Sequence, residues 1–314
     1  AAAPDDEATV RLHVADRRIA LAVFAVLSAI WGYNWILMKL GMQYAGPLTF
    51  VALRGVVATA VLFGVLAAAG RSLRPVAFRE ALLLGLLQTA GFTGLVQLAL
   101  VTGGAGKVAV LAYTMPLWTL LLARLFLGER LQPLQWLAVS CAAGGLVLIL
   151  QPWSLAGSTA SKLLAVGAGL CWAVAVIVAK RMQARRRLDL PSLNAWQLAL
   201  GNIPIILLAW VVPEPAVVWA PELLGALAFV AIPGTALGWI MWLYVLERLP
   251  AGTASLNALA VPAIAVLGAW LQFGERPNPA EAVGMVVIAV GLALMSVVTL
   301  RQERQRAVRV IAQE

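Results

Sequence analysis

The stretch Gly106–Pro133, GKVAVLAYTMPLWTLLLARLFLGERLQP, occurs a second time as Gly252–Pro279, GTASLNALAVPAIAVLGAWLQFGERPNP. The two copies lie 146 positions apart (252 minus 106). At this spacing Pro116 aligns with Pro262, and the triplet Gly-Glu-Arg near the end of one copy aligns with the same triplet in the other. The chain therefore contains an internal duplication. Repeats of apolar helices are typical of transporters that hold their substrate between the two copies.

A weaker repeat links the beginnings of the two halves. Trp31 and Lys39 share the pattern W-x7-K with Trp172 and Lys180. Their spacing of 141 positions (172 minus 31) is slightly shorter than that of the first repeat, so we expect the intervening loops to differ in length.

Composition places the chain in a membrane. Of its 314 residues, 62% are hydrophobic and only 12% are charged, and the mean hydropathy is +0.91. The net charge of +9 comes from residues that lie between apolar runs, which indicates membrane topology rather than nucleic-acid binding. Cys141 and Cys171 lie inside apolar runs and His13 is the single histidine, so the sequence predicts no disulfide, no metal site and no cofactor.

Ten apolar runs are long enough to cross a bilayer, and runs of this length span it as helices. The predicted spans are Ile19–Met38, Pro47–Ala69, Phe78–Val101, Lys107–Leu127, Leu134–Leu150, Leu163–Lys180, Leu190–Val212, Leu223–Val245, Ala251–Gln272 and Ala280–Leu300. The expected fold is an all-α integral membrane protein with ten transmembrane helices.

The basic residues predict how the spans are oriented. Most of the 23 Lys and Arg residues fall on the side of the N-terminus, which places both termini in the cytoplasm. Because each half has five spans, the two halves must then enter the membrane from opposite faces, as inverted repeats. The predicted organisation is a cytoplasmic N-terminal segment (1–18), a first five-helix repeat (19–150), an outer connecting loop (151–162), a second five-helix repeat (163–300) and a cytoplasmic C-terminal tail (301–314).

The layout and several residues resemble the EamA branch of the drug/metabolite transporter superfamily. The resemblance rests on the ten spans, on Trp31-Gly32 with Asn34 and Lys39 in the first span, on Arg54 in the second, and on the Gly-Glu-Arg-x-x-Pro motif that ends the fourth and ninth. Within that branch, the many tryptophans are most similar to the bacterial aromatic amino acid exporters. The resemblance implies a multi-pass protein of the bacterial inner membrane.

Polar and aromatic side chains inside the spans should face a protein interior or a cavity rather than lipid. Helical spacing places Thr89, Thr93 and Gln97 on one face of the third span and Gln88 about half a turn away, so we expect Gln97 to face the centre. The predicted substrate-binding residues are Trp31, Asn34, Thr93, Gln97, Tyr113, Asn194, Gln197, Trp239, Trp242 and Asn257. Packing between helices is the alternative role for each of them, while tryptophans near span ends are expected to anchor the interfaces.

Four further residues have two interpretations each. Pro116 and Pro262 remove a backbone hydrogen bond in the middle of a span, which suits either paired gating hinges or static kinks. Arg54 lies seven residues past Pro47. Both it and Lys39 either attract a substrate carboxylate, or have a structural role in which they bind carbonyl groups of neighbouring helices or reach the outer interface.

The predicted function is export of small metabolites by alternating access, with amino acids that have aromatic or apolar side chains as the predicted substrates. No Asp or Glu lies in the middle of a predicted span, so coupling to protons is expected to be absent or to use residues at span ends. An exporter of cationic drugs is the alternative, although it normally has an acidic group in its cavity. An intramembrane enzyme is a distant alternative, because no G-x-S-x-G or H-E-x-x-H motif occurs. The expected partners are a small solute and the lipid bilayer; one chain suffices for transport and an oligomer stays open.

Overall fold

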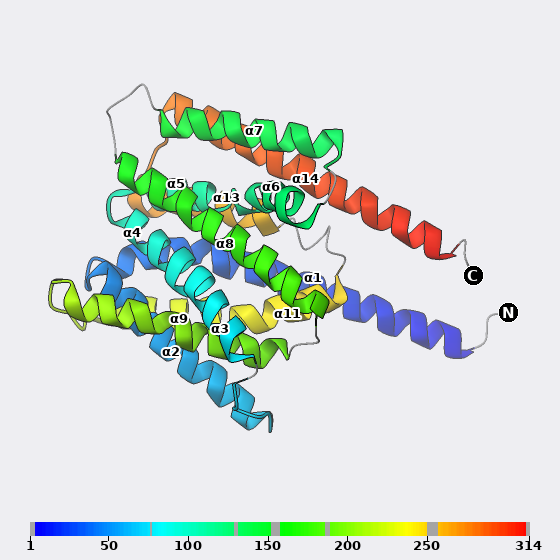
Figure 1. The fold of residues 1–314 in the computed structure, drawn as a ribbon, viewed down its shortest axis with the longest axis horizontal. Helices are drawn as coiled ribbons and strands as arrows, with labels where there is room; N and C mark the ends of the chain where they lie inside the picture. Colours follow the sequence, from blue (N-terminus) through cyan, green and yellow to red (C-terminus); the bar gives the residue numbers. More distant parts are fainter. Residues whose placement is uncertain are drawn as a thin grey trace.

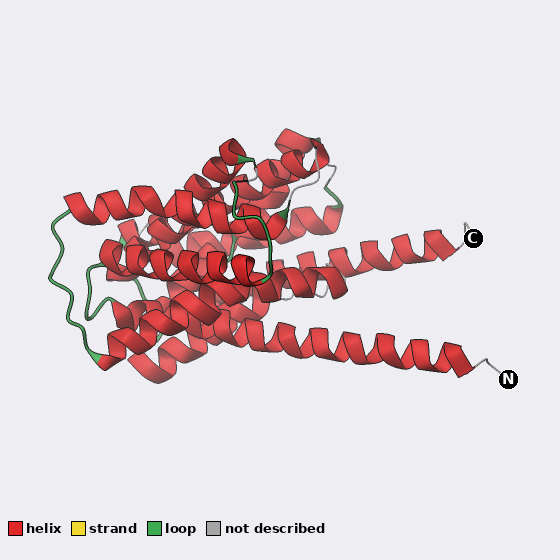
Figure 2. Cartoon of the chain, turned by 90° about the horizontal axis from the view of Figure 1, so that it is seen from below, coloured by secondary structure: helices red, strands yellow, loops and turns green. Residues whose placement is uncertain are grey.

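The computed structural model describes residues 4–75, 77–128, 131–151, 158–185, 189–249 and 257–311. Within these ranges the chain is helical and contains no strand (Figure 2). The first half consists of α1 (Pro4–Gly41), α2 (Pro47–Ala68), α3 (Phe78–Leu84), η1 (Gly85–Thr93), α4 (Gly94–Thr102), α5 (Ala105–Ala112), α6 (Met115–Leu127) and α7 (Pro133–Leu150).

The second half follows the same scheme. It consists of α8 (Thr159–Arg185), α9 (Leu190–Val211), α10 (Pro221–Ala231), η2 (Ile232–Leu237), α11 (Gly238–Arg248), α13 (Asn257–Phe273) and α14 (Pro279–Ile311). The elements η1 and η2 are π-helical and continue their neighbours, so α3, η1 and α4 form one span, and so do α10, η2 and α11.

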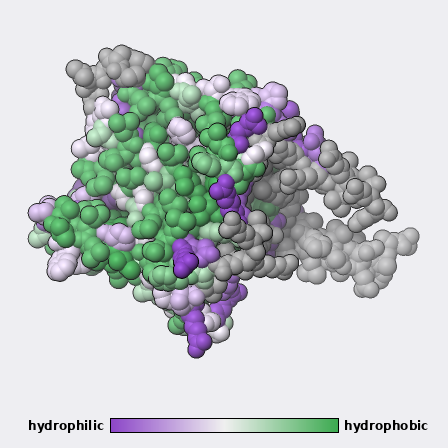
Figure 3. Space-filling model, in the orientation of Figure 1, coloured by the Kyte–Doolittle hydropathy of each residue, from purple (hydrophilic) through white to green (hydrophobic). Residues whose placement is uncertain are grey.

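The described residues include nine helices that are long and apolar enough to cross a membrane, together with a shorter apolar helix at Leu259–Phe273. The shorter helix corresponds to the predicted ninth span, Ala251–Gln272, whose first residues lie outside the described ranges. Figure 3 shows that apolar side chains cover most of the visible face between two polar ends, as a lipid-facing surface requires. The prediction of an all-α integral membrane protein is confirmed.

Proline and glycine set many of the helix boundaries. Proline occupies the first turn of α2, α7, α9, α10 and α14, where its missing N–H costs no hydrogen bond. Gly128 and Gly274, which begin the two Gly-Glu-Arg triplets, have φ of 67° and 65°. This left-handed conformation ends a helix and is accessible to glycine without strain, so both glycines close their spans as the sequence indicates. Glu129 and Arg130 lie outside the described residues.

The packing of the helices is symmetric under exchange of the two halves. Helices α7 and α14 lie side by side along one edge of the molecule (Figure 1). The contact of α1 with α13 has its counterpart in the contact of α8 with α5 and α6, and the contact of η1 with α9 has its counterpart in that of η2 and α10 with α2. An internal duplication predicts this exchange. The opposite orientation of the two halves in a bilayer stays a prediction.

The two ends of the described chain project from the same end of the molecule. Helix α1 is 38 residues long and α14 is 33 residues long, and both continue beyond the bundle in the same direction (Figures 1 and 2). An even number of crossings requires such an arrangement. The side of the membrane on which this end lies is predicted only by the distribution of basic residues.

Candidate functional site

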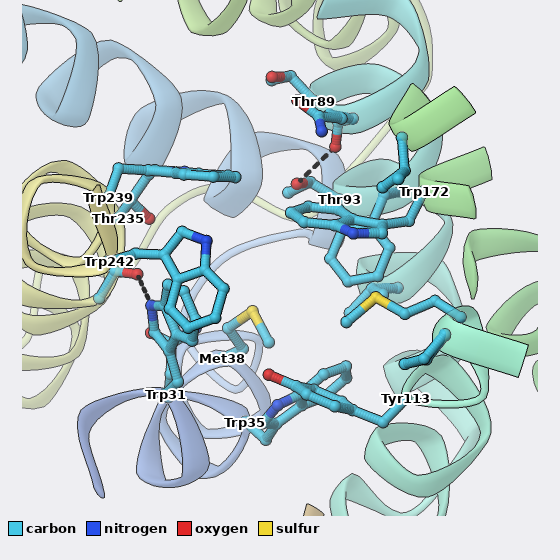
Figure 4. Close-up of a pocket in the computed structure, with 18 of the residues that line it drawn as sticks. Trp31, Trp35, Met38, Thr89, Thr93, Tyr113, Trp172, Thr235, Trp239 and Trp242 are labelled. Atoms are coloured by element: carbon cyan, nitrogen blue, oxygen red, sulfur yellow. Dashed lines mark hydrogen bonds between the residues drawn. The ribbon is translucent and has the colours of Figure 1, made fainter. Parts of the chain in front are cut away.

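A cavity of about 440 Å³ lies between the two halves of the chain (Figure 4). Helices of both halves contribute to its wall, and its volume falls in the range of small-molecule sites. It is lined by Trp31, Asn34, Trp35, Met38, Arg54, Gln88, Thr89, Phe92, Thr93, Val96, Tyr113, Met115, Pro116, Trp172, Val176, Gln197, Leu198, Gly234, Thr235, Trp239, Trp242, Leu292, Met295 and Ser296. None of these lining residues is acidic.

Aromatic rings form a connected wall around the cavity. Trp172 of α8 and Trp239 of α11 are stacked, with ring centroids 5.6 Å apart and planes 15° apart. The ring of Trp31 lies 6.4 Å from that of Trp239, and the ring of Phe92 lies 4.9 Å from that of Trp172. Because these aromatic side chains come from four different spans, an apolar ligand in the cavity would contact both halves at once.

A second aromatic pair faces this wall. Trp35 of α1 and Tyr113, which follows α5, have ring centroids 6.2 Å apart in an edge-on arrangement. Figure 4 shows both rings on the opposite side of the space from Trp239. The cavity is therefore bounded by π faces and edges on two sides.

The π-helical segments η1 and η2 carry polar residues to the cavity. Thr93 Oγ donates to the carbonyl of Gln88 at 3.3 Å, and Thr235 Oγ donates to the carbonyl of Val230 at 2.8 Å. Both bonds reach five residues back along the chain, as the wider turn of a π-helix requires. Thr89 and Thr235, which are separated by the 146 positions of the repeat, both line the cavity.

Widened turns are common at functional sites because they expose backbone groups. Here the carbonyl of Gly234, in η2, accepts a hydrogen bond from Trp31 Nε1 at 3.1 Å. This bond fixes the Trp31 ring, whose other neighbour in the wall is Trp242 with a centroid distance of 5.7 Å. The polar edge of Trp31 is thus occupied and its face remains available for packing.

The fourth span is interrupted beside the cavity. Helix α5 ends at Ala112 and α6 begins at Met115, and Pro116 has no N–H to donate to the carbonyl one turn earlier. Between the two helices the hydroxyl of Thr114 donates to Leu111 O at 2.6 Å and accepts from Trp118 Nε1 at 3.1 Å. Broken helices next to a substrate site are a recurring feature of transporters.

Most of the predicted site residues line this cavity. They are Trp31, Asn34, Thr93, Tyr113, Gln197, Trp239 and Trp242, together with Pro116 and Arg54. Asn194 does not line the cavity itself. Its Oδ1 accepts a hydrogen bond from Nε2 of the lining residue Gln197 at 2.8 Å. The side chain of Asn257 lies outside the part of the chain that the structure describes.

The expectation that Gln97 rather than Gln88 faces the centre differs from the structure. Gln88 lines the cavity, whereas Gln97 is fully buried behind it with its Nε2 3.5 Å from the carbonyl of Met38. The physical reason is the π-helical segment η1. Helical spacing predicts the orientation of side chains in a uniform α-helix, and the wider turns of η1 change the relative orientation of the two glutamine side chains.

Pro262 and Lys39 lie away from the cavity. Pro262 lines a separate apolar cleft of about 520 Å³, together with Val110, Trp270 and Met285. Lys39 Nζ lies 2.6 Å from Glu275 Oε1 and donates to the carbonyl of Gly103 at 3.0 Å. Lys39 therefore binds a carboxylate of the protein itself at the end of α1.

Three aromatic cavity residues were not among the predicted site residues. Trp35 lies one turn beyond Trp31 on α1, and Phe92 lies within the π-helical segment η1 of the third span. Trp172 is the repeat partner of Trp31, so the W-x7-K pattern itself contained the signal for it.

The membrane-length helices, the cavity between the two halves and the interrupted spans define a multi-pass membrane transporter. The model of the EamA-like transporter family matches the chain twice, at residues 18–151 and 160–297. The chain belongs to this family, and each half carries one match.

Similar proteins are named as transporters. The transporter YoaV of Bacillus subtilis is 25% identical over 281 residues, which cover 88% of this chain and 95% of YoaV. The inner membrane transporter YedA of Escherichia coli is 26% identical over 87% of this chain and 90% of its own length. A probable terminal-alkyne amino-acid exporter of Streptantibioticus cattleyicolor is 26% identical over 64% of this chain and 67% of its own length. A crystal structure with 20% sequence identity and a TM-score of 0.63, covering 91% of this chain and 99% of the other, has the same fold.

Proposed function

We propose that this EamA-family transporter exports amino acids with aromatic or apolar side chains, from the cytoplasm across the bacterial inner membrane. The name of the S. cattleyicolor relative supports an amino-acid substrate. The central cavity is the proposed binding site, with Trp31, Asn34, Thr93, Tyr113, Gln197, Trp239 and Trp242 in contact with the solute. Asn194 acts in this proposal by orienting Gln197, and Gln97 by packing behind the wall.

The observation that carries the proposal is the aromatic wall built by both halves. Trp31 and Phe92 come from the first half, and Trp172 and Trp239 from the second. Aromatic side chains attract apolar groups by burial and by stacking. A ligand that is stacked between the halves also couples them, which alternating access requires.

Alternating access also requires that the helix bundle is closed at one end while the cavity is accessible from the other. Lys39 pairs with Glu275, and Lys107 pairs with Glu281, at the end of the spans away from the chain termini. The cavity extends from Trp242 and Ser296, in the halves of their spans nearer the termini, to Arg54, in the half of α2 away from them. With cytoplasmic termini, the proposed conformation is closed to the outside by these ion pairs.

Counterflow in proteoliposomes tests the proposal. Vesicles preloaded with unlabelled phenylalanine should take up labelled phenylalanine, and aromatic or large apolar amino acids should compete, whereas aspartate and lysine should not. Vesicles without protein are the blank. The proposal is wrong if cationic dyes compete and aromatic amino acids do not, since that outcome assigns the protein to the drug exporters.

The drug-exporter alternative is weakened by one residue of the cavity. Arg54 lines the wall, and no acidic residue among the lining residues offsets its charge. A cationic drug in the same cavity would be repelled by the guanidinium, strongly so at low dielectric constant.

A further inference from the structure

Arg54 is a cation that lines an aromatic cavity without an anionic partner in the part of the chain that the structure describes. Among the described residues, ion pairs join Lys39 with Glu275, Arg71 with Asp189 and Lys107 with Glu281, and Arg54 is in none of them. Its guanidinium donates to Met38 Sδ at 3.0 Å. A thioether is a weak acceptor for a group with five N–H donors, so most of the donor capacity of Arg54 is unused.

The position of Arg54 makes an unused charge costly. Seven residues separate it from Pro47 at the start of α2, which is roughly 10 Å along the helix axis. This depth keeps the guanidinium away from the interface to which arginine side chains usually extend. An ionisable group at such depth marks a functional site by default, and its missing partner is an anion.

The acidic residue near the start of α2 already has other partners. Glu214 accepts hydrogen bonds from the backbone N–H groups of Leu48 and Thr49, both at 2.8 Å, and so caps the N-terminus of α2. Glu275 is likewise held by Lys39 and by the N–H of Ala105. Both carboxylates are therefore bound by groups other than Arg54, and the guanidinium of Arg54 remains open to the cavity.

Arg54 is held on a rigid helix. Asn202 of α9 is 2% exposed and donates to the carbonyl of Ala52 at 3.1 Å, which ties α2 to α9 two residues before Arg54. The direction of the guanidinium is thus set by packing, as precise recognition of a planar carboxylate requires.

The cavity also contains amide groups that suit the rest of an amino-acid head group. Asn34 lies one turn before Met38 on α1, about 6 Å along the axis from the residue that Arg54 contacts. Its Oδ1 is buried and has no hydrogen-bond partner among the described residues, and the same is true of Gln197 Oε1. A carboxamide presents either its oxygen or its NH₂ by rotating half a turn, so Asn34 can accept from an ammonium group.

We propose that Arg54 is the carboxylate-binding residue of the central cavity, so that the transported solutes are aromatic or apolar monocarboxylates, held by the carboxylate at Arg54 with the apolar group among the tryptophans. This inference rests on the proposed function for its choice of solute. It adds that the carboxylate is the required group and the ammonium is not.

A panel of three solutes separates the two head groups. The probes are L-phenylalanine, 3-phenylpropanoate, which lacks the ammonium, and 2-phenylethylamine, which lacks the carboxylate. Their Kd values for the purified full-length protein can be measured by tryptophan fluorescence, since tryptophans line the site. The two carboxylates should bind within about tenfold of each other, and the amine about 10- to 100-fold more weakly, the usual range for a charged hydrogen bond.

Variants of Arg54 test the residue itself. Arg54→Gln should raise the Kd of both carboxylate solutes by about 10- to 100-fold and leave the Kd of the amine unchanged or lower it. Arg54→Lys should restore part of the lost affinity for the carboxylates. Arg71→Gln is the matched control, because Arg71 is exposed and pairs with Asp189 outside the cavity. All three Kd values should be unchanged in that control.

The inference is overturned if the amine binds the wild type as tightly as phenylalanine, if none of the three solutes binds, or if Arg54→Gln leaves both carboxylates unaffected. If Arg54→Gln does not fold, the wild-type panel alone decides. Failure of the proposed function looks different: 3-phenylpropanoate would bind through Arg54 and be transported while amino acids show no counterflow.

Discussion

At the scale of single residues, Trp172 and Trp239 form a stacked pair within the second half, and Phe92 and Trp31 of the first half pack against it. The planes of the stacked pair are 15° apart at a centroid distance of 5.6 Å, and Phe92 lies edge-on against Trp172 at 4.9 Å. One ring comes from α8 and the other from α11, so removing either ring leaves the other without a stacking partner.

Trp239→Ala should therefore reduce phenylalanine counterflow by about tenfold or more, because stacking and burial of an aromatic ring together contribute more than 1.4 kcal/mol. Trp239→Phe should retain most of the activity, since it keeps a ring at that position. Counterflow rates normalised to the amount of protein in the vesicles measure the effect. Trp210→Ala is the control, because Trp210 is 85% exposed at the end of α9. Equal rates in Trp239→Ala and the control would remove Trp239 from the site.

At the scale of elements, the interrupted spans decide which side chains reach the cavity. The span order, the helix ends at Gly128 and Gly274, and the cavity residues Trp31, Trp239 and Trp242 follow from hydrophobic runs, turn residues and helical spacing, and all of these were predicted. Gln88 was not. A π-helical turn depends on tertiary packing and leaves no periodic signal, so a uniform 100° per residue gives the wrong face for residues beyond it.

The irregular segment η1 crosses α9 at close range. The carbonyl of Gly85 would lie 2.3 Å from a Cβ atom at Gly201, and the carbonyl of Gln197 would lie 2.4 Å from a Cβ atom at Gly85. Both distances are shorter than any real contact, so glycine at both positions lets the two backbones touch. Gln197 is positioned by this crossing.

Gly201→Ala should force α9 away from η1 and lower the thermal midpoint in detergent by about 2–12 °C. Overpacking of this kind costs about 1–3 kcal/mol, and each kcal/mol corresponds to about 2–4 °C. Gly144→Ala is the matched control, because a Cβ atom at Gly144 meets nothing within 4 Å. An unchanged midpoint in Gly201→Ala would show that the crossing can relax and does not fix Gln197.

At the scale of the whole molecule, Glu275 joins three spans at the end of the helix bundle opposite the termini. Glu275 connects Lys39 of α1 with the N–H of Ala105 at the start of α5, and it follows α13 in the chain. The side chains of Lys39 and Glu275 are 28% and 22% exposed, so the pair is only partly screened by solvent. This contact spans both halves, as a closure at one end of an alternating-access carrier should.

Glu275→Gln should loosen that end. Amide hydrogen exchange of residues 103–108 should become about fivefold faster, which corresponds to about 1 kcal/mol for a partly buried pair. Exchange in η1 should stay the same. Arg71→Gln breaks an exposed pair elsewhere and should leave residues 103–108 unaffected. Unchanged exchange in Glu275→Gln would mean that apolar packing alone closes this end.

The arrangement of the two halves in the membrane makes the widest prediction. Gln132 and Asn278, which are separated by the 146 positions of the repeat, begin α7 and α14 with reciprocal side-chain to backbone hydrogen bonds to the residue three positions on. If the halves are inverted and the termini are cytoplasmic, the corner at Gln132 faces the cytoplasm and the corner at Asn278 faces outward.

Single cysteines at Gln132 and Arg276, both exposed, should report this in a chain without Cys141 and Cys171. A membrane-impermeant maleimide should label Arg276→Cys in intact cells and Gln132→Cys only in inside-out vesicles. Labelling of both from one side would place the two repeats in parallel, and the repeat-based account of alternating access would then fail. Reversed labelling would keep the inversion and move the termini outside. The end that Lys39 and Glu275 close would then face the cytoplasm, because its position opposite the termini is fixed by the fold.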